Sequence, residues 1–150
     1  MKTAILYYSK HHGNTRKLCR AIAATDPDVM LVDVINDGIP DLKNFDRIGL
    51  ASGIYAGKPG KELLTAAATC LREKKPVFLI LTSSLCRDSF FKALQEAVEK
   101  SGSTVIGKYQ CQGYDTFGPF KLVGGVSKGH PDKSDIAGAV AFYKGLPAEA

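Results

Sequence analysis

The sequence contains no C-x-x-C pair and no long apolar run. Its four cysteines are widely spaced, at Cys19, Cys70, Cys86 and Cys111, so neither a zinc site nor a thioredoxin-type redox pair is predicted. The first apolar run stops at Ser9, which is too early for a signal peptide and far too early to span a membrane. These absences predict a protein that is not exported, has no membrane partner and keeps its thiols reduced in the cytoplasm.

A short polar segment follows the first apolar run and leads directly into a helical pattern. It comprises Ser9, Lys10, His11, His12, Gly13, Asn14 and Thr15. A chain that leaves a buried parallel strand and turns into a helix presents unpaired backbone N–H groups, with the positive end of the helix dipole behind them. Gly13 also permits a positive φ or a close backbone approach, which a Cβ would resist. The segment is therefore predicted to bind a phosphate group.

The same segment lacks the motifs of the best-known nucleotide sites. It has neither G-x-G-x-x-G, which binds a dinucleotide pyrophosphate, nor G-x-x-x-x-G-K-[ST], which binds a nucleoside triphosphate with magnesium. It begins with Ser9, whereas a phosphatase that forms a cysteinyl-phosphate needs a thiolate at this place. We therefore predict a loop that holds a phosphate and does not attack it.

Short apolar runs alternate with segments of helical period along the chain. The runs predict strands at Thr3–Tyr8, Val29–Val34, Arg47–Ala51, Val77–Leu81 and Thr104–Tyr109. Helices are predicted between them, the third capped by Asp88 and the last, after Pro131, capped by Ser134. At 150 residues and 45% hydrophobic content, the chain is predicted to form a single domain over residues 1–150. The predicted fold class is α/β, with a three-layer, doubly wound sheet of five parallel strands.

Two further loops follow the third and fourth predicted strands. A glycine-rich turn at residues 51–60 contains Ser52, Gly53, Ile54 and Tyr55, and the next loop contains Thr82, Ser83, Ser84 and Leu85. Because parallel strands end at one edge of the sheet, the three loops are predicted to meet there and to suit a flat ring with a phosphate tail. Tyr55 is predicted to contact that ring. A response regulator would need an acidic cluster after the first strand and an aspartate after the third, and the sequence has neither.

Together these three segments resemble the FMN site of the flavodoxin family, and the resemblance covers nearly the whole chain. It implies the flavodoxin-like strand order 2-1-3-4-5, with FMN as the cofactor. It also implies roles for the residues: Ser9 through Thr15 hold the phosphate, Ser52 through Tyr55 flank the isoalloxazine, and Thr82 through Leu85 approach its pyrimidine edge. The flavin then does the redox chemistry, and no catalytic side chain is required.

Three functions stay open on this evidence. The first is a flavodoxin-type redox protein that carries electrons through bound FMN. The second is a small FMN-dependent NAD(P)H or quinone oxidoreductase, and the third is a flavin-free interaction or regulatory domain that retains the fold. The sequence shows no recognisable nicotinamide-binding motif, which favours the carrier.

The charge of the chain departs from that of the family, whose electron carriers are usually strongly acidic. The formal net charge is +5, and cations lie in or beside all three loops: Lys10, Arg16, Lys58, Lys61 and Arg87. A basic mouth predicts a redox partner protein with an acidic docking surface. Nucleic-acid binding is not predicted, because the cations are spread along the chain without an aromatic-rich RNA motif.

The histidines and the glycine-rich segment at residues 112–133 complete the expectations. Metal binding is not predicted, because His11 and His12 are adjacent and point apart while His130 is remote in sequence. Cys86 is predicted to be an ordinary loop cysteine. The segment at residues 112–133 is predicted to be irregular and partly functional, with Tyr114 or Phe117 covering the flavin.

Overall fold

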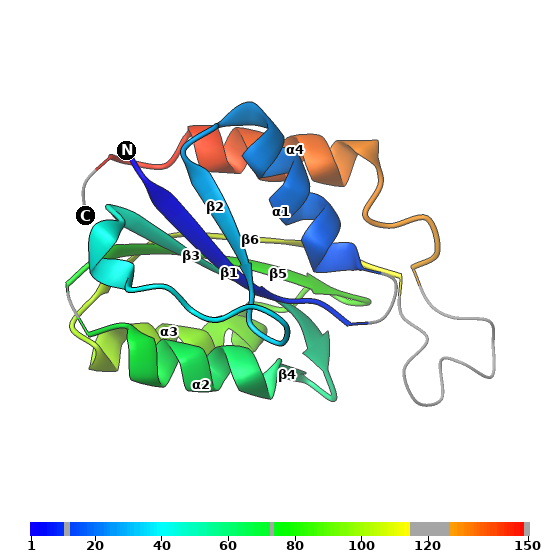
Figure 1. The fold of residues 1–150 in the computed structure, drawn as a ribbon. Coiled ribbons are helices and arrows are strands. Elements are labelled where there is room, and N and C mark those ends of the chain that lie inside the picture. Colours follow the sequence, from blue (N-terminus) through cyan, green and yellow to red (C-terminus); the bar gives the residue numbers. More distant parts are fainter. Residues whose placement is uncertain (11–12, 73, 115–126, 149–150) are drawn as a thin grey trace.

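The protein has a central parallel sheet with helices on both faces (Figure 1). The computed structural model describes residues 1–10, 13–72, 74–114 and 127–148. Five parallel strands lie in the order β2-β1-β3-β5-β6. Their bounds are β1 Thr3–Tyr8, β2 Val29–Asp33, β3 Arg47–Tyr55, β5 Pro76–Ser83 and β6 Thr104–Gln112. The predicted doubly wound sheet and its strand order are therefore confirmed.

Two pairs of helices cover the sheet. Figure 1 shows α1 (Asn14–Thr25) and α4 (Lys133–Lys144) on one face, and α2 (Lys61–Cys70) and α3 (Lys92–Lys100) on the other. Two short 3₁₀ turns, η1 (Leu42–Asn44) and η2 (Asp88–Phe91), lie in the connections. Within the described ranges, no helix has the length and apolar composition needed to cross a membrane.

Each face of the sheet carries its own apolar cluster. Leu6, Leu50 and Leu79 point toward α2 and α3, whereas Ile5, Phe78 and Ile80 point toward α1 and α4. Both sets are fully buried, as expected for central parallel strands covered on both faces. The core thus holds β1, β3 and β5 rigidly, and their carboxyl ends form one stable edge.

Strand β3 ends later than predicted. The sequence predicted a turn at Ser52–Tyr55, and this prediction is wrong, because these residues continue the strand. Ser52 pairs with Tyr8, and Gly53 pairs with Thr82. The chain turns only at Ala56 and Gly57, where φ is 51° and 81°, and returns as the two-residue strand β4 (Lys58–Pro59), antiparallel to β3. The sequence did not predict this hairpin, because pairing with the neighbouring strands β1 and β5 keeps the chain extended after the apolar run of β3 has ended.

Two predicted helix caps are also wrong. Asp88 begins η2 instead of capping α3, and its carboxylate lies 3.2 Å from the Lys108 ammonium. Ser134 lies inside α4, which Asp132 caps through a capping box with Asp135. The reciprocal hydrogen bonds of this box satisfy two backbone donors, which a serine two residues later cannot do.

Candidate functional site

The first helix begins in a form suited to an anion. Gly13 precedes α1 with φ 65° and ψ 30°, the left-handed conformation that glycine adopts at little cost. The N-cap residue Gly13 has no side chain to cap the helix, and the first turn contains no acidic residue. The Arg16 N–H donates to Ser9 Oγ at 3.3 Å, which draws the loop toward the helix. The start of α1 therefore presents backbone donors and the positive end of a helix dipole.

Asn14 links this helix start to the end of β6. Its Nδ2 donates to the Tyr114 carbonyl at 2.8 Å, and the asparagine is buried. A Cβ on Gly113 would lie 2.7 Å from Asn14 Nδ2, so the glycine is what admits the side chain. Asn14 Oδ1 is buried and has no hydrogen-bond partner among the residues that the structure describes. A buried acceptor without a donor is costly, so this atom marks a place where a ligand hydroxyl would be stabilising.

Two threonines predicted at opposite parts of the cofactor lie together. Thr15 Oγ1 and Thr82 Oγ1 are 2.9 Å apart, and both side chains are buried. Their hydrogen bond ties α1 to β5 directly beneath the loops. The hydroxyls thus fix the distance between the phosphate loop and the end of β5.

Ser52 and Ser83 shape the neighbouring backbone. Ser52 Oγ accepts the Gly60 N–H at 2.9 Å and donates to the Gly53 carbonyl at 2.6 Å, so it holds the end of β3 against the start of α2. Ser83 Oγ donates to the Leu85 carbonyl at 2.6 Å and turns the chain after β5. As a result Leu85 stands 57% exposed at the rim.

A small cavity lies where these elements converge. Its volume is about 20 Å³, and it is lined by Lys10, Asn14, Gly53, Ile54, Tyr55, Thr82, Ser83, Gly113 and Tyr114. Seven of these are predicted site residues, drawn together from three strand ends. The predicted residues Ser9, Gly13, Thr15, Ser52, Ser84 and Leu85 lie outside its lining, whereas His11, His12 and Phe117 lie outside the described residues.

The sequence analysis did not predict Gly113 as a site residue, and it predicted Tyr114 only as a residue that covers the flavin. Both follow β6, whose predicted end at Tyr109 was too early. Since every parallel strand ends at the same edge, the fifth strand end was a usable signal for them.

The rim of the site is basic. Lys10, Arg16, Lys58, Lys61 and Arg87 are all exposed. A hydrogen bond with Tyr8 raises the pKa of Lys10 above its usual value, so this ammonium stays charged. Burial raises the pKa of the Cys86 thiol, which keeps it protonated at neutral pH. A protonated thiol is a poor nucleophile, in agreement with the ordinary loop cysteine that was predicted.

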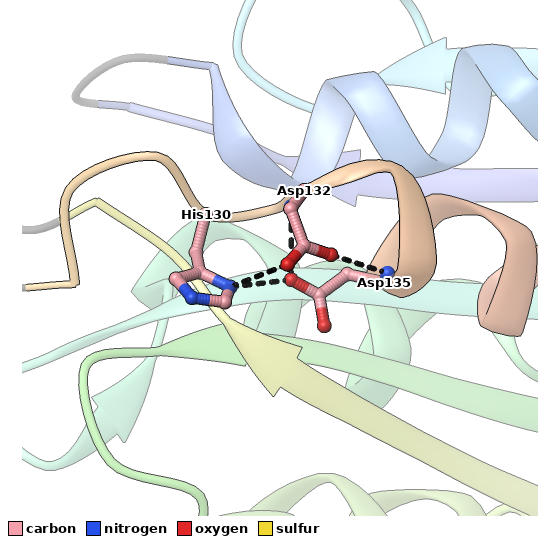
Figure 2. A group of neighbouring side chains, drawn as sticks. All are labelled: His130, Asp132 and Asp135. Atoms are coloured by element: carbon pink, nitrogen blue, oxygen red, sulfur yellow. Dashed lines mark hydrogen bonds and ion pairs between the residues drawn. The ribbon is translucent and has the colours of Figure 1, made fainter.

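His130 lies beside the same loops in an acidic cluster (Figure 2). Its Nδ1 is 2.6 Å from Asp135 Oδ2 and 3.8 Å from Asp132 Oδ2. The His130 carbonyl accepts the Tyr114 N–H at 2.8 Å, and Ser127 Oγ donates to the Ser84 carbonyl at 3.0 Å. The cluster therefore secures residues 127–132 over the loop that follows β5.

The charge on His130 is expected to make stability depend on pH. The hydrogen bond that His130 donates to Asp135 raises the pKa of His130 above 6.5. Burial tends to raise the pKa of Asp135, but hydrogen bonds from His130 and the Asp132 backbone outweigh it and lower that pKa below 3.8. The contribution of His130 to the free energy of unfolding is thus complete below pH 6.5, and it is lost as pH rises through the higher pKa of the folded state. The contribution of Asp135 is lost only in acid, as pH falls through its lowered pKa.

We therefore expect His130→Gln to lower the melting temperature most near pH 5 to 6, with the deficit shrinking toward about pH 8.5. Thermal unfolding followed by circular dichroism across this range measures it. Lys128→Gln is the matched control, because it removes a neighbouring exposed cation and leaves His130 in place. A His130→Gln deficit that is constant with pH would contradict the assignment.

Comparison with known proteins gives concordant results. A family model described as a flavodoxin domain matches residues 4–116. An uncharacterized protein of Methanocaldococcus jannaschii is 36% identical over 149 residues, covering 97% of this chain and 98% of the relative.

Among solved structures, the oxidised flavodoxin 1 of Bacillus cereus aligns with a TM-score of 0.66 at 15% identity, covering 98% of this chain and 100% of that one. A flavoprotein from Lactobacillus acidophilus, solved in complex with FMN, has a TM-score of 0.61 at 21% identity. That alignment covers 73% of this chain and 92% of the other. These two likenesses support the fold.

Proposed function

Because this chain belongs to the flavodoxin family, we propose that it binds FMN at the edge formed by β1, β3 and β5 and carries electrons through it. The observation that carries the proposal is the start of α1 behind the side-chain-free N-cap Gly13, beside the buried Asn14 Oδ1, which has no partner among the described residues. Backbone donors at a helix N-terminus suit a terminal phosphate. A nearby orphaned acceptor suits the hydroxyls of a ribityl chain.

The residues present fit the chemical groups of FMN. The Gly13–Arg16 segment would hold the phosphate, Asn14 would accept from the ribityl chain, and Gly53, Tyr55 and Thr82 would border the ring. When bound, the flavin supplies reversible transfer of electrons, so the protein needs no acid or base of its own. What the chain contributes is orientation, exclusion of water and the surrounding charge.

Asn14→Ala is expected to weaken FMN binding by roughly 1 to 3 kcal/mol, the cost of losing hydrogen bonds in a buried polar site. The side chain both offers Oδ1 and anchors the Tyr114 backbone, so two contributions are removed together. Fluorescence titration of FMN gives the dissociation constants. Asn44→Ala, at an exposed position on η1, is the control; an Asn14→Ala affinity equal to that of Asn44→Ala would contradict the assigned role.

We propose further that the partner is a redox protein with an acidic docking surface. The exposed Leu85 lies on the same rim as the cations Lys10 and Arg87, and the chain carries a formal charge of +5. An apolar centre with a charged border is typical of transient interfaces. The basic rim favours partners of opposite charge and speeds their encounter.

The same rim favours one other function, that of an FMN-dependent NAD(P)H or quinone oxidoreductase, because cations also attract the phosphates of a nicotinamide. Stopped-flow reduction of the FMN-loaded protein separates the two. A carrier should be reduced negligibly by NADPH until a reductase protein is added. Rapid reduction that saturates with NADPH concentration, followed by steady NADPH consumption with a quinone, would instead establish the enzyme.

Reversal of the charges at Lys58 and Lys61 to glutamate is expected to slow reduction of the flavin by its physiological donor, most strongly at low salt where screening is weak. Both lysines are exposed beside the end of β3. Stopped-flow absorbance at several salt concentrations measures the effect. The matched control reverses Lys2 and Lys100, which precede β1 and β6 at the opposite edge and change the net charge equally. Equal rate losses in the two double variants would argue against docking at this rim.

A further inference from the structure

Tyr55 crosses the cofactor site from the end of β3 to the phosphate loop. Its hydroxyl accepts the Lys10 N–H at 2.9 Å, and the same hydroxyl lies 3.4 Å from the Lys10 carbonyl. Its ring packs edge-on against Tyr8, with centroids 5.3 Å apart. Tyr8 in turn occupies the space that a Cβ on Gly60 would fill. The tyrosine is therefore held at both its ring and its hydroxyl.

Gly53 makes this position of Tyr55 possible. A Cβ built on Gly53 would lie 2.7 Å from the Tyr55 hydroxyl oxygen and 2.9 Å from its Cζ, closer than carbon atoms tolerate. Only glycine at this place leaves room for the tip of the tyrosine. The Tyr55 tip thus lies against the strand segment that borders the ring site.

The enclosed space beside the Tyr55 tip is small. The cavity among these residues measures about 20 Å³, which is room for about one water molecule. Tyr55 and Lys10 both line it, and the hydrogen bond between them joins these two walls. A three-ring ligand that enters between the two residues must therefore break this bond.

We propose that Tyr55 is a positioning residue that latches the cofactor site, and that its hydroxyl must leave the Lys10 backbone before the isoalloxazine enters. Because Lys10 belongs to the predicted phosphate loop, the latch joins the two halves of the site. This inference rests on the proposed binding of FMN.

The test compares wild-type protein with Tyr55→Phe, which keeps the ring and removes the hydroxyl. Association of FMN with cofactor-free protein, followed by quenching of flavin fluorescence, should be about two- to tenfold faster in the variant, the effect of one lost hydrogen bond. Hydrogen exchange at the Lys10 amide of the cofactor-free protein should accelerate as well. Tyr109→Phe removes a hydroxyl that bonds to the Asp135 carbonyl and is the control.

The outcomes separate the latch from the proposed function. Faster association in Tyr55→Phe, with an unchanged rate in Tyr109→Phe, supports the latch. Equal association rates in wild type and Tyr55→Phe would overturn the latch and leave FMN binding intact. Failure of the wild type and of Tyr55→Phe to bind FMN would overturn the proposed function, and the latch with it.

Discussion

The wild-type protein is expected to bind FMN at least about a hundredfold more tightly than riboflavin. Each hydrogen bond to a charged group contributes roughly 1.5 to 3 kcal/mol, and a terminal phosphate at the start of α1 accepts at least two from the backbone. Riboflavin has the same ring and ribityl chain but lacks the phosphate. Isothermal titration of the cofactor-free protein with each ligand measures the ratio.

The dependence of each affinity on salt concentration provides the control for the comparison of FMN with riboflavin. Affinity for FMN should fall moderately with ionic strength, because the phosphate is a dianion near Lys10 and Arg16, whereas affinity for riboflavin should barely change. If the protein bound both ligands equally, the start of α1 would not be a phosphate site. The fold would then remain as described, and the function assigned to its edge would be wrong.

Phe78→Ala is expected to lower the free energy of unfolding by about 3 to 5 kcal/mol, a large share of the stability of a domain this size. Phe78 is fully buried on β5. Its ring lies edge-on to Phe142 and Tyr143 of α4, with centroids 6.2 and 5.8 Å away, and the Arg47 guanidinium stands 5.8 Å from its centroid. The truncation therefore removes the contacts that this ring makes with α4. Urea unfolding followed by circular dichroism gives the value.

A double-mutant cycle tests how closely the Phe78 ring packs on Gly49 of β3. A Cβ on Gly49 would lie 2.4 Å from Phe78 Cζ, so Gly49→Ala should destabilise the wild type by roughly 1 to 3 kcal/mol through overpacking. In the Phe78→Ala background the cavity accepts the new methyl group, and the same substitution should cost much less. Additive losses would show that the two residues do not share this space. Phe90→Ala, at a partly buried position on η2, should cost less than Phe78→Ala.

Several site residues were predictable because local chemistry decides their role. Gly13 adopts the positive φ that the sequence allowed, since the turn from β1 into α1 demands it. The doubly wound sheet followed from apolar runs alternating with helices, because buried parallel strands with right-handed crossovers have few arrangements. The order of the strands was implied by the resemblance to the flavodoxin family. The caps at Asp88 and Ser134 failed because several polar residues compete near a helix start, and tertiary contacts such as that between Asp88 and Lys108 choose among them.

The sequence by itself determined the α/β class and the edge at which the polar loops meet, because both depend on periodicity and on the chirality of crossovers. The order of the five strands came from the resemblance of its loops to those of the flavodoxin family. Only the tertiary structure decided that Asn14 bonds to Tyr114, that Thr15 meets Thr82, and that Tyr55 reaches Lys10. Each of these pairs joins residues at least 45 positions apart, and their contact depends on strand register and packing that no local pattern encodes.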